Sequence, residues 1–453
     1  MWEGLAEVDY RRLADGVAKA IAEGRLRPGD RLPPQRTFAR RHRVAVSTAI
    51  RAYGELVRRG LVVGEVGRGT FVRAAPPHPG SVLAEDSGRA PVNLELNYPV
   101  ADGQSELMAR GLAGLARPDV LLEATRPAAA DGTPGAREAA ARVLARPGWH
   151  PDPDRLLFAG NGRQAIAAAL SALVRPGGRV GVEELTYPLV KAVAERLGIT
   201  LVPIGTDGSG LLPSALEAAH RRTPLSAVYV QPTLHNPLSL TMPGARREEL
   251  ARVLRELALV AVEDTTWAFL AAADTPPPLA AYAPERTLLV DSLSKRLAPG
   301  LTVGFLSVPE AYGEEVARAL RSGAWTAGRF NLEAAVRWVE DGTVEAVTAA
   351  KRAEAGARHA LVAGQLGDQA IRTDPCSYYC WWELPAPWRA ETFAAAAAEE
   401  LGIAVTPGSA FAVGAASAPD AVRVGLASPP RPVLDAALRR LAELAVRGRS
   451  ARP

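Results

Sequence analysis

The residue best placed to do chemistry is Lys295, which stands in the segment 291–300 directly after the apolar run 288–290. The chain has four lysines beside 49 arginines, so a lysine at the end of a buried strand indicates that an amine is needed there. An arginine cannot form a Schiff base with a carbonyl group, whereas a lysine can once burial lowers its pKa. Ser292 and Ser294 lie on the same turn, where their hydroxyls could bind a phosphate.

A carboxylate follows a second apolar run. Asp264 ends the segment 260–264, 31 residues before Lys295. We expect the two runs to be neighbouring strands of one sheet, because ligands of open α/β sheets bind at the carboxyl ends of the strands. A carboxylate at that edge could pair with a protonated ring nitrogen. The plainer alternative is that Asp264 caps a helix.

A turn of small residues offers a cradle for a phosphate. Residues 156–165 show a strand, a turn and the start of a helix, with Asn161, Gly162 and Arg163 at the turn. Backbone N–H groups at the start of a helix bind phosphates. This turn therefore predicts an anion site.

Three further side chains complete the set. Tyr187 follows the next apparent strand and could stack on a flat ring, and Asn236 could donate to a phenolic oxygen. Arg423, on a C-terminal strand, offers a fork for a carboxylate. With Lys295 and Asp264, these are the groups that pyridoxal phosphate (PLP) and an amino acid beside it require. Ordinary turn chemistry accounts for each residue singly, but the combination predicts a PLP site.

The elements that must position these residues alternate between strand and helix. Short Val- and Leu-rich runs at 226–230, 259–262 and 287–290 are separated by Ala-rich helical patterns, which predicts βαβ units and a mostly parallel sheet. From about residue 345 a helix and the strands 379–384 and 421–426 predict a smaller α+β domain. We expect a body at 92–453, with its small subdomain from about 330, after a Pro/Gly/Ala-rich linker at 74–91.

The first 73 residues have a different character. A first helix carries Leu13, Val17 and Ile21 on one face, a second begins near Pro34, and a third begins near Ser47 and runs through Ile50, Tyr53 and Leu56 to Gly60. Two short β-like runs then flank residues 64–68. Three helices and a hairpin within some sixty residues predict a winged helix-turn-helix.

The charge of this segment suits a polyanion. Residues 1–75 hold 15 Lys and Arg against 8 Asp and Glu, a net +7, whereas the remainder carries −3. Ser47, Thr48 and Arg51 could read base edges from the third helix. Arg36 lies on the preceding helix, where it could contact the phosphates of the DNA backbone. Arg68, beside Gly69 at the tip of the hairpin, could enter the minor groove. The alternative is that these arginines only solvate a small helical domain.

These motifs resemble known families. The head resembles the GntR-type winged helix in Leu32-Pro33, Arg51-Ala52-Tyr53, Gly60-Leu61 and 67–72, and the order of the body motifs resembles fold type I aminotransferases. Further matching segments are Asn97-Tyr98-Pro99, Gly132-Thr133-Pro134 with Arg137, and Thr406-Pro407-Gly408 with Phe411. The whole chain resembles the MocR family of regulators.

The resemblance implies roles. Lys295 would hold PLP as an internal aldimine, Asp264 would pair with the ring nitrogen and Asn236 with the phenolic oxygen. Tyr187 would stack on the ring, and Arg423 would grip the carboxylate of an effector. The phosphate would be cradled by Asn161, Gly162, Arg163, Ser292 and Ser294. Active sites of this fold lie at a subunit interface, so the resemblance also implies a homodimer.

Three positions depart from the family pattern. Val46 stands where many such heads carry an arginine early in the recognition helix. Trp267 stands where a tyrosine usually reaches the phenolic oxygen; its indole can donate but cannot titrate. Thr302 and Val303 stand where an arginine usually pairs with the phosphate, a role that Arg296 or Arg163 would have to take. We expect weakened PLP affinity and impaired transamination.

The leading hypothesis is a regulator that binds operator DNA and senses an amine or amino acid through a Schiff base at Lys295. A second is a working aminotransferase with an accessory DNA-binding head. A third is a DNA-binding dimer whose body has lost the cofactor. The chain shows no apolar run long enough to span a membrane and no secretion signal, and its two cysteines, Cys376 and Cys380, are too few for a disulfide framework or a metal site. We expect a cytoplasmic protein without a metal.

Overall fold

The N-terminal part of the chain forms three helices and a hairpin. The computed structural model describes residues 10–22, 25–27, 29–58, 61–65, 69–72, 90–300, 303–414 and 418–450. Helices α1 (Tyr10–Ala22), α2 (Gln35–His42) and α3 (Val46–Arg58) precede the strands β1 (Val62–Glu65) and β2 (Gly69–Val72). The strands pair antiparallel, with Val62 opposite Val72. The predicted order of helices and strands is confirmed, and most of the expected linker lies outside the described residues.

The core of this head follows from the helical period. Ala49, Tyr53 and Leu56 of α3 are buried at a spacing of three to four residues, and they pack with α1, α2 and the hairpin. The Tyr53 hydroxyl donates to Pro33 O at 2.6 Å. Ile50 lies one residue off this stripe and is 50% exposed, so it belongs to the outer face of α3.

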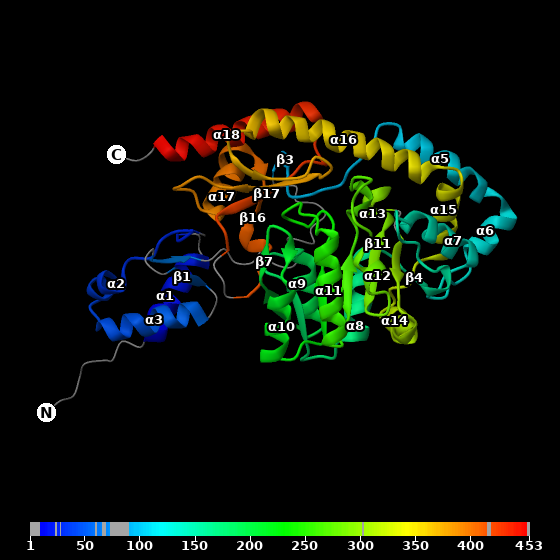
Figure 1. Cartoon of the computed structure of the whole chain (residues 1–453). Helices are drawn as coiled ribbons and strands as arrows, with labels where there is room; N and C mark the ends of the chain where they lie inside the picture. Colours follow the sequence, from blue (N-terminus) through cyan, green and yellow to red (C-terminus); the bar gives the residue numbers. More distant parts are fainter. Residues whose placement is uncertain are drawn as a thin grey trace.

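The body is built on a seven-stranded sheet with the strand order β4-β12-β11-β10-β9-β5-β6. Figure 1 labels β4 and β11 of this sheet among the surrounding helices. Only β12 runs antiparallel to its neighbours. The strands are β4 (Leu156–Ala159), β5 (Arg179–Glu183), β6 (Thr200–Ile204), β9 (Ala227–Val230), β10 (Ala261–Asp264), β11 (Thr287–Ser292) and β12 (Gly304–Ser307). The predicted strands at 226–230, 259–262 and 287–290 are confirmed, with ends that differ by at most two residues, and so is the mostly parallel sheet.

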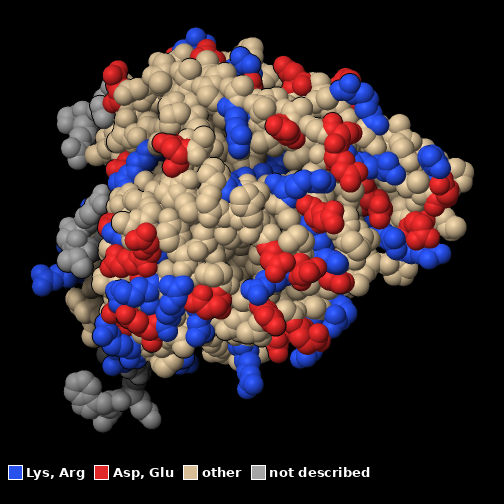
Figure 2. All heavy atoms as spheres, turned by 45° about the vertical axis from the view of Figure 1, so that its right-hand side comes forward, with Lys and Arg blue, Asp and Glu red and all other residues tan. Residues whose placement is uncertain are grey.

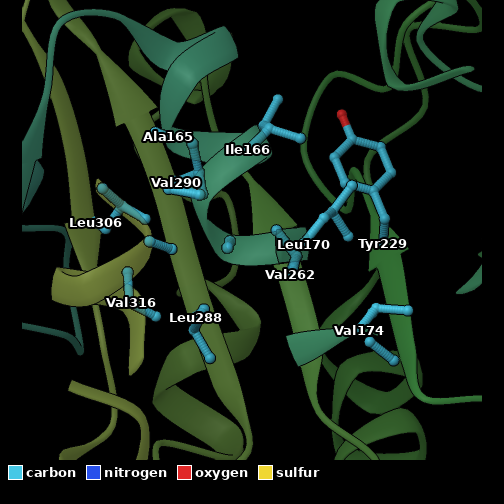
Figure 3. Close-up of a cluster of buried hydrophobic side chains, with 14 of the residues drawn as sticks. Ala165, Ile166, Leu170, Val174, Tyr229, Val262, Leu288, Val290, Leu306 and Val316 are labelled. Atoms are coloured by element: carbon cyan, nitrogen blue, oxygen red, sulfur yellow. The ribbon is translucent and has the colours of Figure 1, made fainter. Parts of the chain in front are cut away.

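Helices cover both faces of this sheet, because its strands are apolar on both sides. Leu288 and Val290 of β11 face α8 (Gly162–Leu173), whereas Leu289 between them joins a cluster on the other face. Figure 3 shows the α8 side, where Leu170 meets the strands and the hydroxyl of Tyr229 points away from the cluster.

The other helices of the body up to residue 340 are α5 (Gln104–Ala113), α6 (Pro118–Ala124), α7 (Pro134–Leu144), α9 (Pro188–Arg196), α10 (Pro213–Arg222), α11 (Gly244–Glu256), α12 (Leu279–Tyr282), α13 (Leu293–Arg296), α14 (Gly313–Ser322) and α15 (Arg329–Glu340). A small hairpin is formed by β7 (Thr206–Asp207) and β8 (Gly210–Leu211).

The C-terminal part forms a smaller domain with its own core. A four-stranded antiparallel sheet has the order β13-β14-β17-β16, and β15 pairs in parallel with β3 from the start of the body. The elements are β3 (Val92–Asn93), α16 (Thr343–Leu366), β13 (Ala370–Arg372), β14 (Tyr379–Glu383), α17 (Ala390–Leu401), β15 (Ile403–Ala404), β16 (Thr406–Pro407), β17 (Ala421–Gly425) and α18 (Arg431–Ser450). Helices α16 and α18 lie side by side at the top of Figure 1. The predicted α+β character is confirmed.

The head lies against α17 of the smaller domain. The guanidinium of Arg389 stacks 4.4 Å from the centre of the Phe71 ring, and Arg27 pairs with Glu399 at 3.4 Å. A cation–π contact and an exposed ion pair are each worth about 1 kcal/mol or less. Each of these two contacts is therefore weak.

The surface mixes charges of both signs, as Figure 2 shows for one face, where acidic and basic side chains are interspersed. No helix in the described part of the chain is both long and apolar enough to cross a bilayer. Both cysteines are free, with Cys380 buried in β14.

Candidate functional site

The predicted cofactor residues come together at the carboxyl edge of the large sheet. Asp264 ends β10, and Lys295 lies in α13 directly after β11; the two strands pair in parallel with Asp264 opposite Val290. Asn161 caps α8 directly after β4. The neighbouring strands inferred from the sequence are therefore present, and they bring the amine, the carboxylate and the anion turn to one edge.

Lys295 is held by groups from two separate parts of the chain. Its Nζ donates to Asn97 O at 2.8 Å. The same nitrogen lies 4.0 Å from the centre of the Tyr98 ring and 5.4 Å from the centre of the Trp267 ring. The aromatic faces accept a positive charge but provide little of the hydration that an ammonium needs.

The pKa of Lys295 reflects this position. Burial lowers it to about 7, and the positive charges of Arg163, Arg423 and Lys351 act in the same direction. Both causes disfavour the ammonium form. A lysine with this pKa is a nucleophilic amine near neutral pH.

Asp264 is oriented by three donors. The Tyr229 hydroxyl donates to Oδ2 at 2.6 Å, and Gln231 Nε2 donates to the same oxygen at 3.0 Å. The backbone N–H of Thr266 donates to Oδ1 at 2.9 Å, so the carboxylate closes a turn; the alternative of a helix cap at Asp264 is wrong, because the N-cap of the next short helix, Ala268–Leu270, is Trp267. The carboxylate thus closes the turn after β10. It is also held by Tyr229 of the neighbouring strand β9 and by Gln231, the residue after β9.

The turn after β4 is narrow. The Asn161 side chain accepts from the Gln164 N–H at 2.9 Å and so caps α8. A Cβ atom at Gly162 would lie 3.2 Å from Ser292 Oγ, so only a hydrogen separates this turn from that hydroxyl. Ser292 in turn caps α13 by accepting from the Ser294 N–H at 3.3 Å. The turn after β4 therefore lies directly against the Ser292 hydroxyl at the start of α13.

Aromatic rings form another side of the site. Tyr187 precedes α9, and burial raises the pKa of its phenol, an effect that the nearby Arg163 guanidinium partly opposes. Trp267 is 7% exposed. The centre of its ring lies 6.4 Å from the centre of the Phe269 ring, in a stacked arrangement, and 5.5 Å from the centre of the Tyr379 ring, in an edge-on arrangement. These contacts hold the Trp267 indole in a packed aromatic group.

Arg423 reaches the site from β17. Its guanidinium donates to Asn236 Oδ1 and to Thr406 Oγ1, each at 3.3 Å, and also to the backbone oxygen of Glu95. Burial lowers the pKa of Arg423, and its Nε is buried without a hydrogen-bond partner. Because the Asn236 amide oxygen faces Arg423, its amide nitrogen points away from that guanidinium.

The family usually has an arginine that pairs with the phosphate where this chain has Thr302 and Val303, and the structure shows where the candidate replacements lie. Val303 is 1% exposed and belongs to the core, and Thr302 lies outside the described residues. Arg296, suggested by the sequence as a replacement, instead pairs with Asp291 at 2.5 Å, with both side chains buried. Of the two candidates, Arg163 is the one that lies at the anion turn.

Several residues of the site were not assigned a role from the sequence. Tyr229 and Gln231 orient Asp264. Tyr98 covers Lys295, and its only signal in the sequence is the segment Asn97-Tyr98-Pro99, which resembles the family. Lys351 is fully buried and donates to Lys295 O at 3.0 Å and Leu297 O at 2.6 Å. Burial lowers the pKa of Lys351 to about 7. Its signal in the sequence was the rarity of lysine.

The predicted DNA-contact residues lie on the outside of the head. Arg36 on α2 and Ser47 and Arg51 on α3 are exposed, and Thr48 is half-buried. Gly69 has a φ of 127°, and a Cβ atom there would lie 2.7 Å from Arg31 Nε, so the start of β2 requires glycine. Arg68 lies outside the described residues. Val46 and Ile50, 43% and 50% exposed, share the outer face of α3.

Comparison with known proteins agrees with this architecture. Residues 9–72 match the family described as bacterial regulatory proteins of the gntR family, and residues 124–441 match aminotransferase class I and II. The uncharacterized HTH-type transcriptional regulator YdeF of Bacillus subtilis is 30% identical over 93% of this chain and 90% of its own length. The chain belongs to the MocR family.

Further relatives and solved structures are similar to this MocR protein. The HTH-type pyridoxine biosynthesis transcriptional regulator PdxR of Corynebacterium glutamicum is 25% identical over 79% of this chain and 78% of its own length. Kynurenine aminotransferase from Pyrococcus horikoshii superposes with a TM-score of 0.73 over 84% of this chain and 96% of its own, at 20% identity. That likeness shows the fold type I architecture of the body. The MocR relatives are HTH-type transcriptional regulators with an aminotransferase-like domain.

Proposed function

We propose that this protein is a transcription regulator that binds double-stranded operator DNA and senses an amine or amino acid through PLP held at Lys295. The observation that carries the proposal is a buried amine with a pKa of about 7 after β11, the strand next to the one that ends at Asp264, on the same chain as a GntR-type head. We assign residues 1–73 to a winged-helix DNA-binding domain, 74–91 to a linker and 92–453 to the sensing body, with its small subdomain from about 330.

The residues present fit PLP. Lys295 supplies an amine for the aldehyde, Asp264 a carboxylate for the ring nitrogen, and the Tyr187 ring an aromatic face. Gly162 lets the turn after β4 approach Ser292 closely, so that a phosphate bound beside them would meet backbone N–H groups of the turn and the hydroxyls of the cradle. When bound, PLP supplies an electrophilic carbon that exchanges one amine for another.

The effector carboxylate is assigned to Arg423. Its buried Nε has no partner, and burial has already lowered the pKa of its guanidinium, so an incoming carboxylate would satisfy both the orphan donor and the desolvated charge. Asn236, which accepts from Arg423, would be oriented by the same guanidinium. An effector with both an amine and a carboxylate would therefore engage Lys295 and Arg423 together.

The outer face of α3 is assigned to the major groove. Ser47 and Arg51 can hydrogen-bond to base edges, and exposed Val46 and Ile50 can contact thymine methyl groups. Arg36 on α2 is assigned to a phosphate. Because residues 1–75 carry a net charge of +7 and contact DNA phosphates, binding should weaken as salt rises.

We further propose a cytoplasmic homodimer. Leu121 and Leu122 on α6 are 41% and 62% exposed, and Phe330 on the neighbouring α15 is 38% exposed, which supports burial of this face by a second copy. The small contact between Arg389 and Phe71 supports a head whose position responds to the body, because about 1 kcal/mol is readily outweighed by effector binding.

The test combines a spectrum with a DNA assay. The purified chain should absorb at the edge of the visible range, Lys295→Ala should lose this band, and one class of amino acid should change it. Duplexes selected from a random library by the wild-type chain should shift at moderate salt, and the same amino acid should alter that shift. Arg423→Leu should keep the band and lose the amino-acid response.

Each other outcome refutes the proposal in a distinct way. A coloured protein that turns over a keto acid and selects no DNA would be an aminotransferase. A protein that stays colourless with excess PLP but selects DNA would be a regulator whose body serves only assembly. No selected DNA sequence at any salt concentration would refute the regulator itself.

A further inference from the structure

A cavity lies behind the edge of the sheet that carries Lys295. It has a volume of about 440 Å³, and its wall includes Thr265 and Asp291. Their chain neighbours, Asp264 and Ser292, belong to the Lys295 site. Side chains that follow one another along a strand point to opposite faces, so this pocket and the Lys295 site lie on opposite sides of the same strand ends. None of the described residues that line the pocket belongs to the proposed PLP cradle.

Most of the pocket wall is apolar. It is contributed by the end of α7 and the loop after it, by the segment after β10, and by β11. The apolar side chains that matter for the argument are Leu144, Trp149, Ala268, Leu270, Pro278 and Leu289. A wall of this kind, in a cavity of several hundred cubic ångströms, is typical of sites for small organic molecules.

The polar part of the wall carries excess positive charge. Arg146 and Arg352 line the pocket, together with Asp291, which is already paired with Arg296. Burial, and then the charges of Arg296 and Arg352, lower the pKa of Arg146 to about 10, with Asp291 acting in the opposite direction. Three guanidiniums thus surround one carboxylate.

Two further observations concern the arginines of this cluster. Arg296, which is not itself part of the pocket wall, has its Nε buried without a hydrogen-bond partner. Arg352 uses its Nε on Phe269 O at 2.6 Å, and its pKa too is lowered by burial and by Arg296. A carboxylate placed here would relieve repulsion among the guanidiniums and accept charge-assisted hydrogen bonds. Asp274 and Asp374 lie toward Cys376, and Arg352 lies near that thiol as well, so Arg146 is the cation farther from those two acids.

We propose that this pocket binds a small organic monoanion, with its carboxylate at Arg146 and Arg352 and an apolar or aromatic body against the remaining wall. The site is separate from the one at Lys295 and goes beyond the proposed sensing of an amine. The ligand class is an aryl- or alkyl-carboxylate without a required amino group, because the described wall offers a cluster of cations for the acid and an apolar surface for the rest.

The test uses 4-fluorophenylacetate, followed by 19F NMR on the full-length protein, with neutral 4-fluorophenylacetamide as the matched probe. We expect saturable binding of the acid and at least tenfold weaker binding of the amide. Arg146→Gln and Arg352→Gln should each weaken binding of the acid at least tenfold. Arg318→Gln, which removes an exposed arginine from α14, should leave binding unchanged, and so should Lys295→Ala.

Arg352 is only partly buried, so Arg352→Gln tests the site even if Arg146→Gln fails to fold. Absence of saturable binding, equal binding of the amide, or unchanged binding in both pocket variants would overturn the proposal. Loss of binding in Lys295→Ala would overturn it too, by placing the acid in the other site. A colourless protein that binds no DNA but binds the acid as expected would refute the proposed function while supporting this pocket.

Discussion

The depressed pKa of Lys295 leads to a quantitative expectation. At a pKa of about 7 roughly half of the Lys295 amine is free base at pH 7, against about one molecule in 3,000 for a lysine at the ordinary value of 10.5. Because the charge of Arg163 is one cause of the depression, Arg163→Gln should move the Lys295 midpoint upward. Burial is the first cause and remains in that variant, so the midpoint should stay below 10.5.

The chain offers a direct assay because it has only four lysines. Protein labelled with 13C at the lysine ε-carbon and freed of any cofactor with hydroxylamine should give four signals. Lys295→Ala and Lys351→Met assign two of them, and both of these should titrate near pH 7. A Lys295 signal that moves only near pH 10.5 would refute the burial argument, and an unchanged midpoint in Arg163→Gln would refute the assigned influence of that charge.

The same two lysines affect stability with a definite sign. Between pH 7 and 10.5 the unfolded chain carries their protons while the folded chain does not, so the free energy of unfolding of the cofactor-free protein should rise with pH across this window. The rise should be shallower in Lys351→Met, whose buried amine has been removed. Denaturant titrations at a series of pH values measure both slopes, and a fall in stability from pH 7 to 9 would contradict the assignment.

Three further predictions concern the cradle, the carboxylate and the head. Gly162→Ala places a methyl group 3.2 Å from Ser292 Oγ, so PLP affinity should fall at least about tenfold by absorbance titration, whereas affinity for pyridoxal, which lacks the phosphate, should change less; an equal loss for both ligands would place the phosphate elsewhere. Tyr229→Phe removes a donor to Asp264, so the free energy of unfolding should fall by roughly 1.5–3 kcal/mol in denaturant titrations, and an unchanged midpoint would show that this bond contributes nothing. Arg51→Ala should weaken binding to the selected DNA by about 1–3 kcal/mol in mobility shifts and relax the sequence preference at one position. An equal loss of affinity for all DNA sequences would indicate a phosphate contact instead.

Much of the fold could be predicted because its signals are local. The strand, turn and helix around Gly162, the strand before Lys295 and the order of elements in the head all follow from short-range periodicity and turn chemistry. The juxtaposition of Asp264 and Lys295 could be predicted as well, since parallel strands bring their carboxyl ends to one edge. These features need no knowledge of distant partners.

The rest depends on residues far apart in the chain. Whether Arg296 could serve a phosphate was decided by its burial against Asp291, and whether Ile50 was core or surface was decided by the rotation of α3 on its neighbours. Neither outcome has a signal in composition or spacing, because both depend on which faces pack together.

By itself, the sequence of this protein determined the kinds of group present and the turns that carry them. These are a rare lysine after a buried strand, an acid at the end of another strand, and a basic head. Only the tertiary structure decided their chemistry. Tyr98, 197 residues before Lys295 in the chain, covers its amine, and Arg163 and Arg423 lie near enough to disfavour its charge. The physical reason is that desolvation and Coulomb interactions depend on distance in space, which packing sets and sequence separation does not.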